Sequence, residues 1–280
     1  MKIKETVEKI GRWIRRPTGK ASLWLILASI VLALLGASDL GNLTERAAAN
    51  INSILFGIAT NLLGIAITIS FVQFFIDQQQ EKDDRTEEAR RILRQDRIMQ
   101  ELIEIYTVQY NQLTTPFDER KGFPAFDSTK LNLEFVFTDL RDLYQVSILV
   151  RDKIYCSAIV SFYESEQKLR EYCSVSLRDI DYKYYPEIGE LLLNFVRIST
   201  SFDVRNVILS FVPKSMDDQE MSSYISKLIG DNSTNWVELA HSGELGSNIM
   251  IPFVSLYDML KAEGQLIVTY CEAVKKVSIS

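Results

Sequence analysis

Few residues in this chain of 280 could carry out chemistry, and they are widely spaced. His241 is the only histidine, so a Ser-His-Asp triad, a Cys-His dyad or a histidine-based metal site would have to include it. It lies in the stretch Ala240-His241-Ser242-Gly243-Glu244, whose composition is typical of a loop. We therefore expect a surface histidine without a catalytic role.

The three cysteines, Cys156, Cys173 and Cys271, lack the C-x-x-C spacing of metal and redox sites. With only 3 cysteines, 12 glycines and 6 prolines, the chain is neither a disulfide scaffold nor collagen-like. We expect the cysteines to be buried apolar residues or free thiols in a reducing compartment. The glycine-rich phosphate-binding motifs and the H-E-x-x-H zinc motif are also missing from the sequence.

Two acidic pairs, Asp179/Asp181 and Glu187/Glu190, have oxygen ligands that suit Mg²⁺. Helical surfaces carry such pairs routinely, so they do not by themselves predict a metal site. The sequence therefore predicts no enzyme: no catalytic residue, no cofactor and no metal. A cryptic hydrolase in the second half of the chain stays open as the least favoured alternative.

The strongest signal is the uneven distribution of charge. A hydrophobic share of 47%, a charged share of 24% and a mean hydropathy of +0.01 are ordinary for a globular protein. However, charged residues are absent from 21–38 and 47–76, which are 18 and 30 residues long. A helix rises about 1.5 Å per residue, so the shorter stretch covers roughly 27 Å of a hydrocarbon core about 30 Å thick. We expect transmembrane helices at 21–40 and 51–76, joined by an external loop at 41–50.

Basic residues flank these segments on one side only. Residues 1–20 contain seven Lys and Arg and residues 77–97 contain six, whereas 39–50 contain only Arg46. The positive-inside rule therefore predicts a multi-pass membrane protein with both termini in the cytoplasm. A cleaved signal peptide is the alternative for the first segment, because Gly36-Ala37-Ser38 resembles a cleavage site.

The basic N-terminal segment 1–20 has a helical apolar pattern of its own. We expect a short amphipathic helix in the membrane interface, ending before Pro17 and followed by the first spanning helix. A plain basic tail is the equal alternative. The residues expected to anchor this segment are Trp13, Arg12, Arg15 and Arg16.

Small and polar residues form a stripe on each apolar helix, because they recur every three or four residues. On the second helix the stripe consists of Ser53, Gly57, Thr60, Asn61, Gly64 and Thr68, and on the first of Ser29, Ala33 and Gly36/Ala37. Small residues allow close helix packing, and Asn61 can hydrogen-bond across helices where no water competes. Two interpretations remain open: packing of the two helices on each other, or an oligomeric seam that lines a wet path through the membrane.

The charged segment 77–113 follows without a glycine or proline, so the second apolar helix should continue through it as a stalk. Its apolar residues at near-heptad spacing are Ile92, Met99, Ile103, Tyr106, Tyr110 and Leu113. This pattern indicates either a helix that packs on the rest of the protein or a short oligomerising coiled coil.

Residues 114–280 show further helical periodicity and should form an all-α bundle in the cytoplasm. We expect helices at about 128–150, 154–172, 188–211, 216–229 and 253–277. In the first of these, Leu131, Leu133, Phe135 and Phe137 also alternate as a strand would, and the length of the segment favours a helix.

Charge separates the ends of the chain. Residues 1–20 carry a net charge of +5, while residues 114–280 have 17 basic and 24 acidic side chains, a net charge of −7. The acidic body disfavours direct binding to nucleic acid or anionic lipid. The expected partner of this body is a protein or a small ligand, and self-association is also expected.

This layout of a basic N-terminus, two closely spaced apolar helices and a helical body resembles the two-helix membrane effectors of bacterial anti-phage abortive-infection systems, retron effectors included. The resemblance implies a toxin-like protein of the bacterial inner membrane that a controlling protein or nucleoprotein complex, such as a reverse transcriptase with its nucleic acid, holds inactive until infection. It covers the layout of the whole chain and assigns no functional residue. The alternative is a membrane-anchored scaffold or regulatory subunit with no activity of its own.

Overall fold

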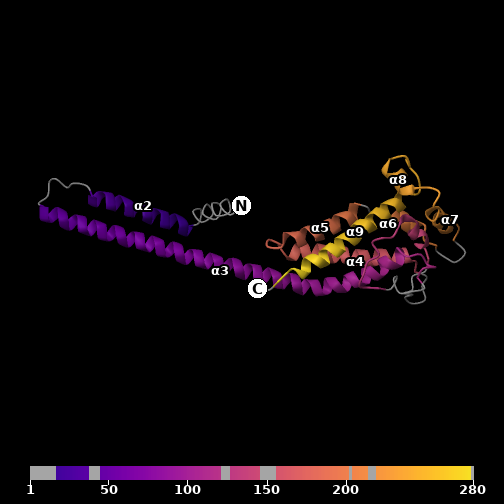
Figure 1. The fold of residues 1–280 in the computed structure, drawn as a ribbon, viewed down its shortest axis with the longest axis horizontal. Helices are drawn as coiled ribbons and strands as arrows, with labels where there is room; N and C mark the ends of the chain where they lie inside the picture. The colour runs from indigo at the N-terminus through magenta and orange to yellow at the C-terminus, as the bar shows by residue number, and fades with distance from the viewer. Residues whose placement is uncertain are drawn as a thin grey trace. The chain divides into compact units, whose positions relative to one another are not determined.

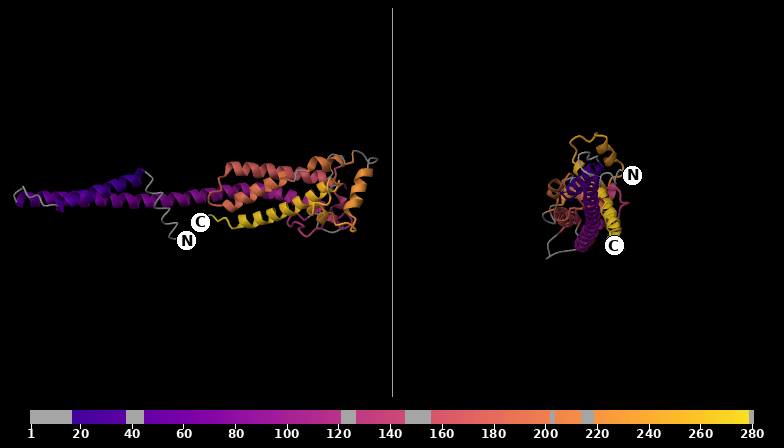
Figure 2. Two further views of the ribbon diagram at one scale, coloured as in Figure 1. Left: turned by 90° about the horizontal axis from the view of Figure 1, so that it is seen from above. Right: turned by 90° about the vertical axis from the view of Figure 1, so that its left-hand side faces the viewer.

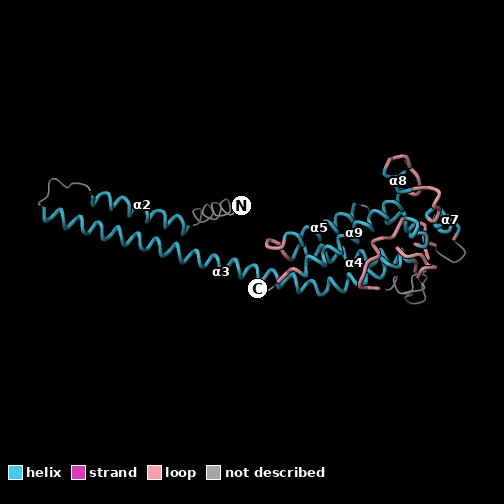
Figure 3. Tube along the Cα trace, viewed as in Figure 1, coloured by secondary structure: helices cyan, strands magenta, loops and turns pink. Residues whose placement is uncertain are grey.

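The computed structural model describes residues 17–37, 45–120, 127–145, 156–201, 204–213 and 219–278. Within these ranges the chain forms helices, turns and loops but no β-strand (Figure 3). The all-α fold class is therefore confirmed for the described residues. The chain divides into two compact units, residues 1–85 and 86–280, and each is described by itself below.

The first unit contains helix α2 (Pro17–Ala37) and the beginning of helix α3 (Glu45–Leu113), which lie side by side (Figures 1 and 2). The Ser29 hydroxyl donates a hydrogen bond to the backbone oxygen of Ala59, with 2.8 Å between the two oxygens. Nearer the turn, a Cβ on Gly36 would lie 3.3 Å from Leu55 Cβ. The two helices are therefore antiparallel, and a residue without a side chain lets them approach closely at Gly36.

Helix α3 continues for 69 residues from the apolar stretch into the charged one, as the lack of breakers predicted. It ends at Leu113, shortly before Pro116, because the residue before a proline is disfavoured in helical geometry. The six near-heptad residues of the charged stretch are all buried in the second unit. Of the two interpretations of that pattern, packing on the rest of the protein is confirmed.

The core of the second unit lies between four long helices: α3, α4 (Ala158–Asp179), α5 (Pro186–Ser201) and α9 (Ile251–Lys275), which run side by side in Figures 1 and 2. Tyr106 of α3 is fully buried at the centre of this core. The centroid of its ring lies 5.5 Å from the ring centroid of Phe162 and 6.2 Å from that of Phe195. Aromatic contacts of this kind bury large apolar areas and favour tilted or edge-on geometry.

Shorter elements close one end of this bundle: the 3₁₀ helix η2 (Phe137–Asp142), α6 (Arg205–Ser210), α7 (Glu220–Ile229) and α8 (Trp236–His241). The helix predicted at 253–277 corresponds to α9, whose two ends each lie two residues earlier. Helix α4 begins at Ala158 and continues beyond the predicted end to Asp179, and the single helix predicted at 188–211 is divided into α5 and α6. Residues 215 and 216, the predicted start of α7, lie outside the described residues.

Helix α8 was not predicted. The Asn235 side chain caps it by accepting a hydrogen bond from the backbone N–H of Glu238.

The helix predicted at 128–150 is wrong for the described residues 128–145. Only Phe137–Asp142 of these residues are helical, in the 3₁₀ helix η2, while residues 131–136 form a turn and loop. Burial alternates from residue 133 to residue 137, as in the strand-like pattern of the sequence. Their backbone oxygens find side-chain partners in place of helical ones, because the Lys261 ammonium group donates to the oxygens of Leu133 and Phe135. Leu133 packs closely on α9, where a Cβ on Gly264 would lie 2.7 Å from Leu133 Cδ2.

Candidate functional site: the two apolar helices

Both apolar helices are long and apolar enough to span a membrane. Only 17% of the most apolar window of α2 and 11% of that of α3 is buried. A core helix of a soluble protein would be mostly covered, whereas Trp24, Leu34 and Phe75 are each more than 60% exposed. The first unit thus presents apolar side chains over most of its described surface.

On α2 the predicted stripe lies partly on the face that contacts α3. Ser29 and Gly36 are buried, Ala33 is half-buried and Ala37 is exposed. The contact face also includes Ser22, which is buried. Small residues therefore line this face of α2, as the sequence indicated.

On α3 a different set of residues contacts α2. Ala59 and Ala66 are 3% and 0% exposed and lie seven residues apart. The half-buried residues between and beside them continue the same 3–4 spacing: Leu55, Leu62, Ile69 and Gln73. This heptad pattern is typical of antiparallel helices that pack with a small crossing angle.

The predicted α3 stripe does not face α2, because all six of its residues are exposed: Ser53, Gly57, Thr60, Asn61, Gly64 and Thr68. No atom lies within 4 Å of a Cβ built on Gly57 or Gly64. Asn61 is two residues from Ala59, and two residues turn a helix by about 200°. The α3 stripe is therefore an uncovered surface, nearly opposite the contact with α2.

The polar groups of this stripe differ in how they are satisfied. The hydroxyls of Thr60 and Thr68 donate to backbone oxygens of the preceding turn, those of Phe56 and Gly64, at 2.8 and 2.9 Å. Such bonds let threonine sit in an apolar environment. The Asn61 amide has no hydrogen-bond partner among the described residues, and its two donors and one acceptor oxygen remain available. Asn61 is thus the stripe residue with the most unmet hydrogen-bonding capacity.

The predicted interfacial anchor residues, Arg12, Trp13, Arg15 and Arg16, lie outside the described residues.

In the second unit, His241 is a surface residue at the end of α8, as expected. Its Nε2 lies 2.9 Å from Asp258 Oδ2, and its side chain is 58% exposed. His241 and Asp258 line a groove of about 190 Å³, and Ser255 lines it as well. However, no hydrogen bond joins Ser255 to His241 in the described structure, so the three side chains do not form a triad.

The acidic pairs are also not assembled into a site. Asp179, Asp181 and Glu190 line a broad groove of about 540 Å³, together with the basic side chains of Arg91 and Arg178. Among the described residues, no group of three or more His, Cys, Asp or Glu side chains could hold a metal ion. Mixed charge and an open surface are typical of a solvated helix end.

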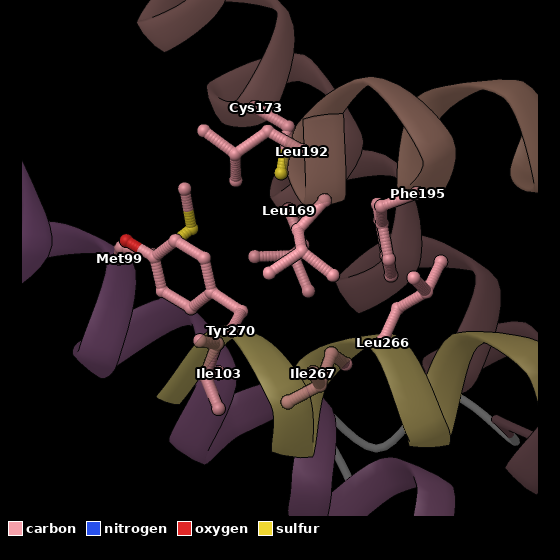
Figure 4. A pocket seen from close by; sticks show the side chains of 10 residues that line it. Met99, Ile103, Leu169, Cys173, Leu192, Phe195, Leu266, Ile267 and Tyr270 are labelled. Carbon is pink, nitrogen blue, oxygen red and sulfur yellow. The ribbon is translucent and has the colours of Figure 1, made fainter. Parts of the chain in front are cut away.

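All three cysteines are free. Cys173 is buried beside a small apolar cavity of about 20 Å³, which Met99 and Tyr270 also line (Figure 4). Burial raises the pKa of the Cys173 thiol to about 12, so this thiol stays protonated and unreactive. Cys156 and Cys271 are partly buried.

Two acidic side chains in the bundle core were missed by sequence reasoning. Glu263 of α9 is fully buried and accepts a hydrogen bond of 2.7 Å from the Tyr106 hydroxyl. Glu166 of α4 is 3% exposed, accepts from the Ser199 hydroxyl and lies 3.7 Å from Arg170 Nε. The available signal was the position of Glu263 within the apolar stripe of α9, between Leu260 and Ile267.

No protein-family model, no curated protein and no solved structure matches this chain.

Proposed function

We propose that α2 and residues 45–76 of α3 form a transmembrane hairpin of the bacterial inner membrane. The hydrogen bond between Ser29 and Ala59 is the observation that carries this proposal. Ser29 lies at the centre of the uncharged stretch 21–38, and Ala59 lies within three residues of the centre of 47–76. The two uncharged stretches are therefore centred at one level, as two crossings of a single bilayer require.

Orientation follows from the flanking charge. The seven basic residues in 1–20 and the six in 77–97 favour the cytoplasm, and the short loop with Arg46 favours the outside. In this topology the second unit is cytoplasmic, and Asn61 lies near the bilayer midplane. An amide at that depth is costly unless it finds a partner.

We further propose that the exposed α3 stripe joins copies of this chain in the membrane. Gly57 and Gly64 allow a second helix to approach closely, and an Asn61 amide can both donate to and accept from the same residue of another copy. Because α2 occupies the opposite face of α3, the hairpin can oligomerise without opening. A polar seam of this kind provides a route for ions or water through the hairpin assembly.

The proposed biological role is that of a partner-controlled effector, in which the second unit receives the control and the hairpin perturbs the membrane. This is the role of the abortive-infection effectors that the layout resembles. The net charge of −7 over residues 114–280 supports a protein, or the protein part of a nucleoprotein complex, as the controlling partner.

Expression of the chain without a partner in a bacterial host tests the effector role. We expect loss of membrane potential and entry of propidium iodide. The double variant Asn61→Leu, Gly64→Leu should restore the potential at an equal protein level, because it removes the amide and blocks close approach. Its matched control, Ile58→Leu with Ile65→Leu, changes exposed residues at the same depth and should stay toxic.

Normal growth and potential at high expression of the wild-type chain would contradict the effector role and leave the anchored scaffold. Equal rescue by both double variants would show that any change in the lipid-exposed surface suffices, and that the stripe is not the seam.

A further inference from the structure

The turn that follows α3 contains a buried arginine with unmet hydrogen-bonding capacity. Arg120 is 6% exposed, and its Nε donates to the backbone oxygen of Thr115 over 2.9 Å. Its two terminal nitrogens, Nη1 and Nη2, are screened from solvent and have no acceptor among the described residues. Four N–H groups of one guanidinium are therefore unsatisfied.

A second buried donor lies in the same turn. Thr115 is also 6% exposed, and its hydroxyl has no hydrogen-bond partner. The hydrogen bond from Arg120 Nε to the backbone oxygen of Thr115 holds the guanidinium against the backbone of this threonine. The backbone of Arg120 is held as well, because its N–H donates to the oxygens of Pro116 and Phe117. The turn thus presents two unpartnered side chains on a fixed backbone.

Arginine cannot escape this situation by losing its proton. Burial lowers the pKa of Arg120 and the nearby carboxylate of Asp142 raises it, but a guanidinium stays charged at any physiological pH. Asp142 does not satisfy the terminal nitrogens, since no ion pair within 4 Å joins it to Arg120 in the described part of the chain and its Oδ2 accepts from the backbone N–H of Phe117. A buried charge in this state needs an anion with acceptor atoms.

We infer that Arg120 and Thr115 form a binding site for a small oxyanion, a phosphate or carboxylate group. The two terminal nitrogens of a guanidinium match two oxygens of such a group side by side, and the Thr115 hydroxyl supplies one further donor. Asp142 lowers the net positive charge of the site, so a group with a single negative charge fits it better than one with two. This inference does not depend on the membrane role proposed above.

Thermal unfolding of the full chain in detergent tests the site, with inorganic phosphate and acetate as probes and chloride at equal ionic strength as the reference. Because the nitrogens are covered, the protein is dialysed overnight against each anion before heating. We expect at least one oxyanion to raise the Tm in a saturable manner, as a ligand bound only to the folded state does. A rise with phosphate alone identifies a phosphate group, and a rise with acetate alone identifies a carboxylate.

Three variants separate the site from general salt effects. Arg120→Lys keeps the charge but loses the paired nitrogens, and Thr115→Val removes only the hydroxyl. We expect at least a tenfold weaker oxyanion affinity for Arg120→Lys and a smaller loss for Thr115→Val. Arg178→Gln, which removes an arginine that is 76% exposed, should bind as the wild type does. The inference is overturned if neither oxyanion stabilises the wild type beyond chloride, or if Arg120→Lys and Thr115→Val both retain the full effect.

Discussion

The second unit buries an acidic side chain, Glu263, in its core. Glu263 has one oxygen bonded to the Tyr106 hydroxyl and one, Oε1, with no partner in the structure. Burial raises the pKa of Glu263 well above its ordinary value, and the nearby charge of Glu166 raises it further. The hydrogen bond from Tyr106 and the charge of Arg170 oppose this shift. Burial therefore favours the protonated form of Glu263 in the folded protein.

The raised pKa predicts how stability depends on pH. The folded state holds a proton that the unfolded chain releases above about pH 4.3, so the Glu263 contribution to the free energy of unfolding falls as pH rises. We expect Glu263→Gln to reduce this fall by up to about 1.4 kcal/mol per pH unit, the slope for one proton. Urea unfolding in detergent between pH 4.5 and 7.5, followed by circular dichroism, measures it. Glu272→Gln, an exposed change on the same helix, is the control, and an identical slope in all three proteins would contradict the assignment.

At the scale of elements, contacts with residues distant in the sequence determine the conformation of segments whose local periodicity fits more than one structure. Residues 131–135 are not helical, and two of them, Leu133 and Phe135, contact residues of α9. The Lys261 ammonium group donates to the backbone oxygens of these two residues, 2.6 Å from that of Leu133, and lies 4.2 Å from the centre of the Phe135 ring. One side chain therefore satisfies backbone groups that a helix would have satisfied internally.

This role of Lys261 predicts a local loss of stability. Lys261→Met keeps the aliphatic stem but leaves the oxygens of Leu133 and Phe135 without their charged donor. We expect a loss of about 1–3 kcal/mol in the free energy of unfolding and faster amide hydrogen exchange in residues 127–137 than in α9. Lys275→Met, an exposed change near the end of α9, should alter neither measurement. Uniform exchange across the second unit in Lys261→Met would contradict the local role.

At the scale of the whole molecule, the chain joins a lipid-compatible unit to a soluble-type helical bundle through one continuous helix, α3. The first unit exposes apolar side chains, whereas the second buries its apolar residues in a core shared by four helices. The proposed function requires the first unit to cross the membrane, so its topology is the first property to test.

Reporter fusions test that topology. Alkaline phosphatase, which is active only outside the inner membrane, should be inactive when fused after Ser280 and active when inserted within 41–44. Green fluorescent protein fused after Ser280 should be fluorescent. An active phosphatase after Ser280 would reverse the orientation, and a loss of the first apolar segment from the mature protein would establish the signal-peptide alternative.

The sequence by itself determined the all-α class, the two uncharged stretches and the continuity of α3, because these depend on local composition and on the absence of helix breakers. It also determined that residues such as Met99 and Tyr106 would be buried, since their spacing marks one face of a helix.

Only the tertiary structure decided which face of α3 meets α2. Ala59 and Ala66 are as small as the residues of the polar stripe, and helix periodicity cannot say which of two small-residue faces is covered. It likewise decided that residues 131–135 form a turn and loop instead of a helix and that Arg120, Glu166 and Glu263 are buried. Each depends on partners more than 20 residues away or on a turn whose backbone the sequence does not specify, and such contacts leave no periodic signal in the chain.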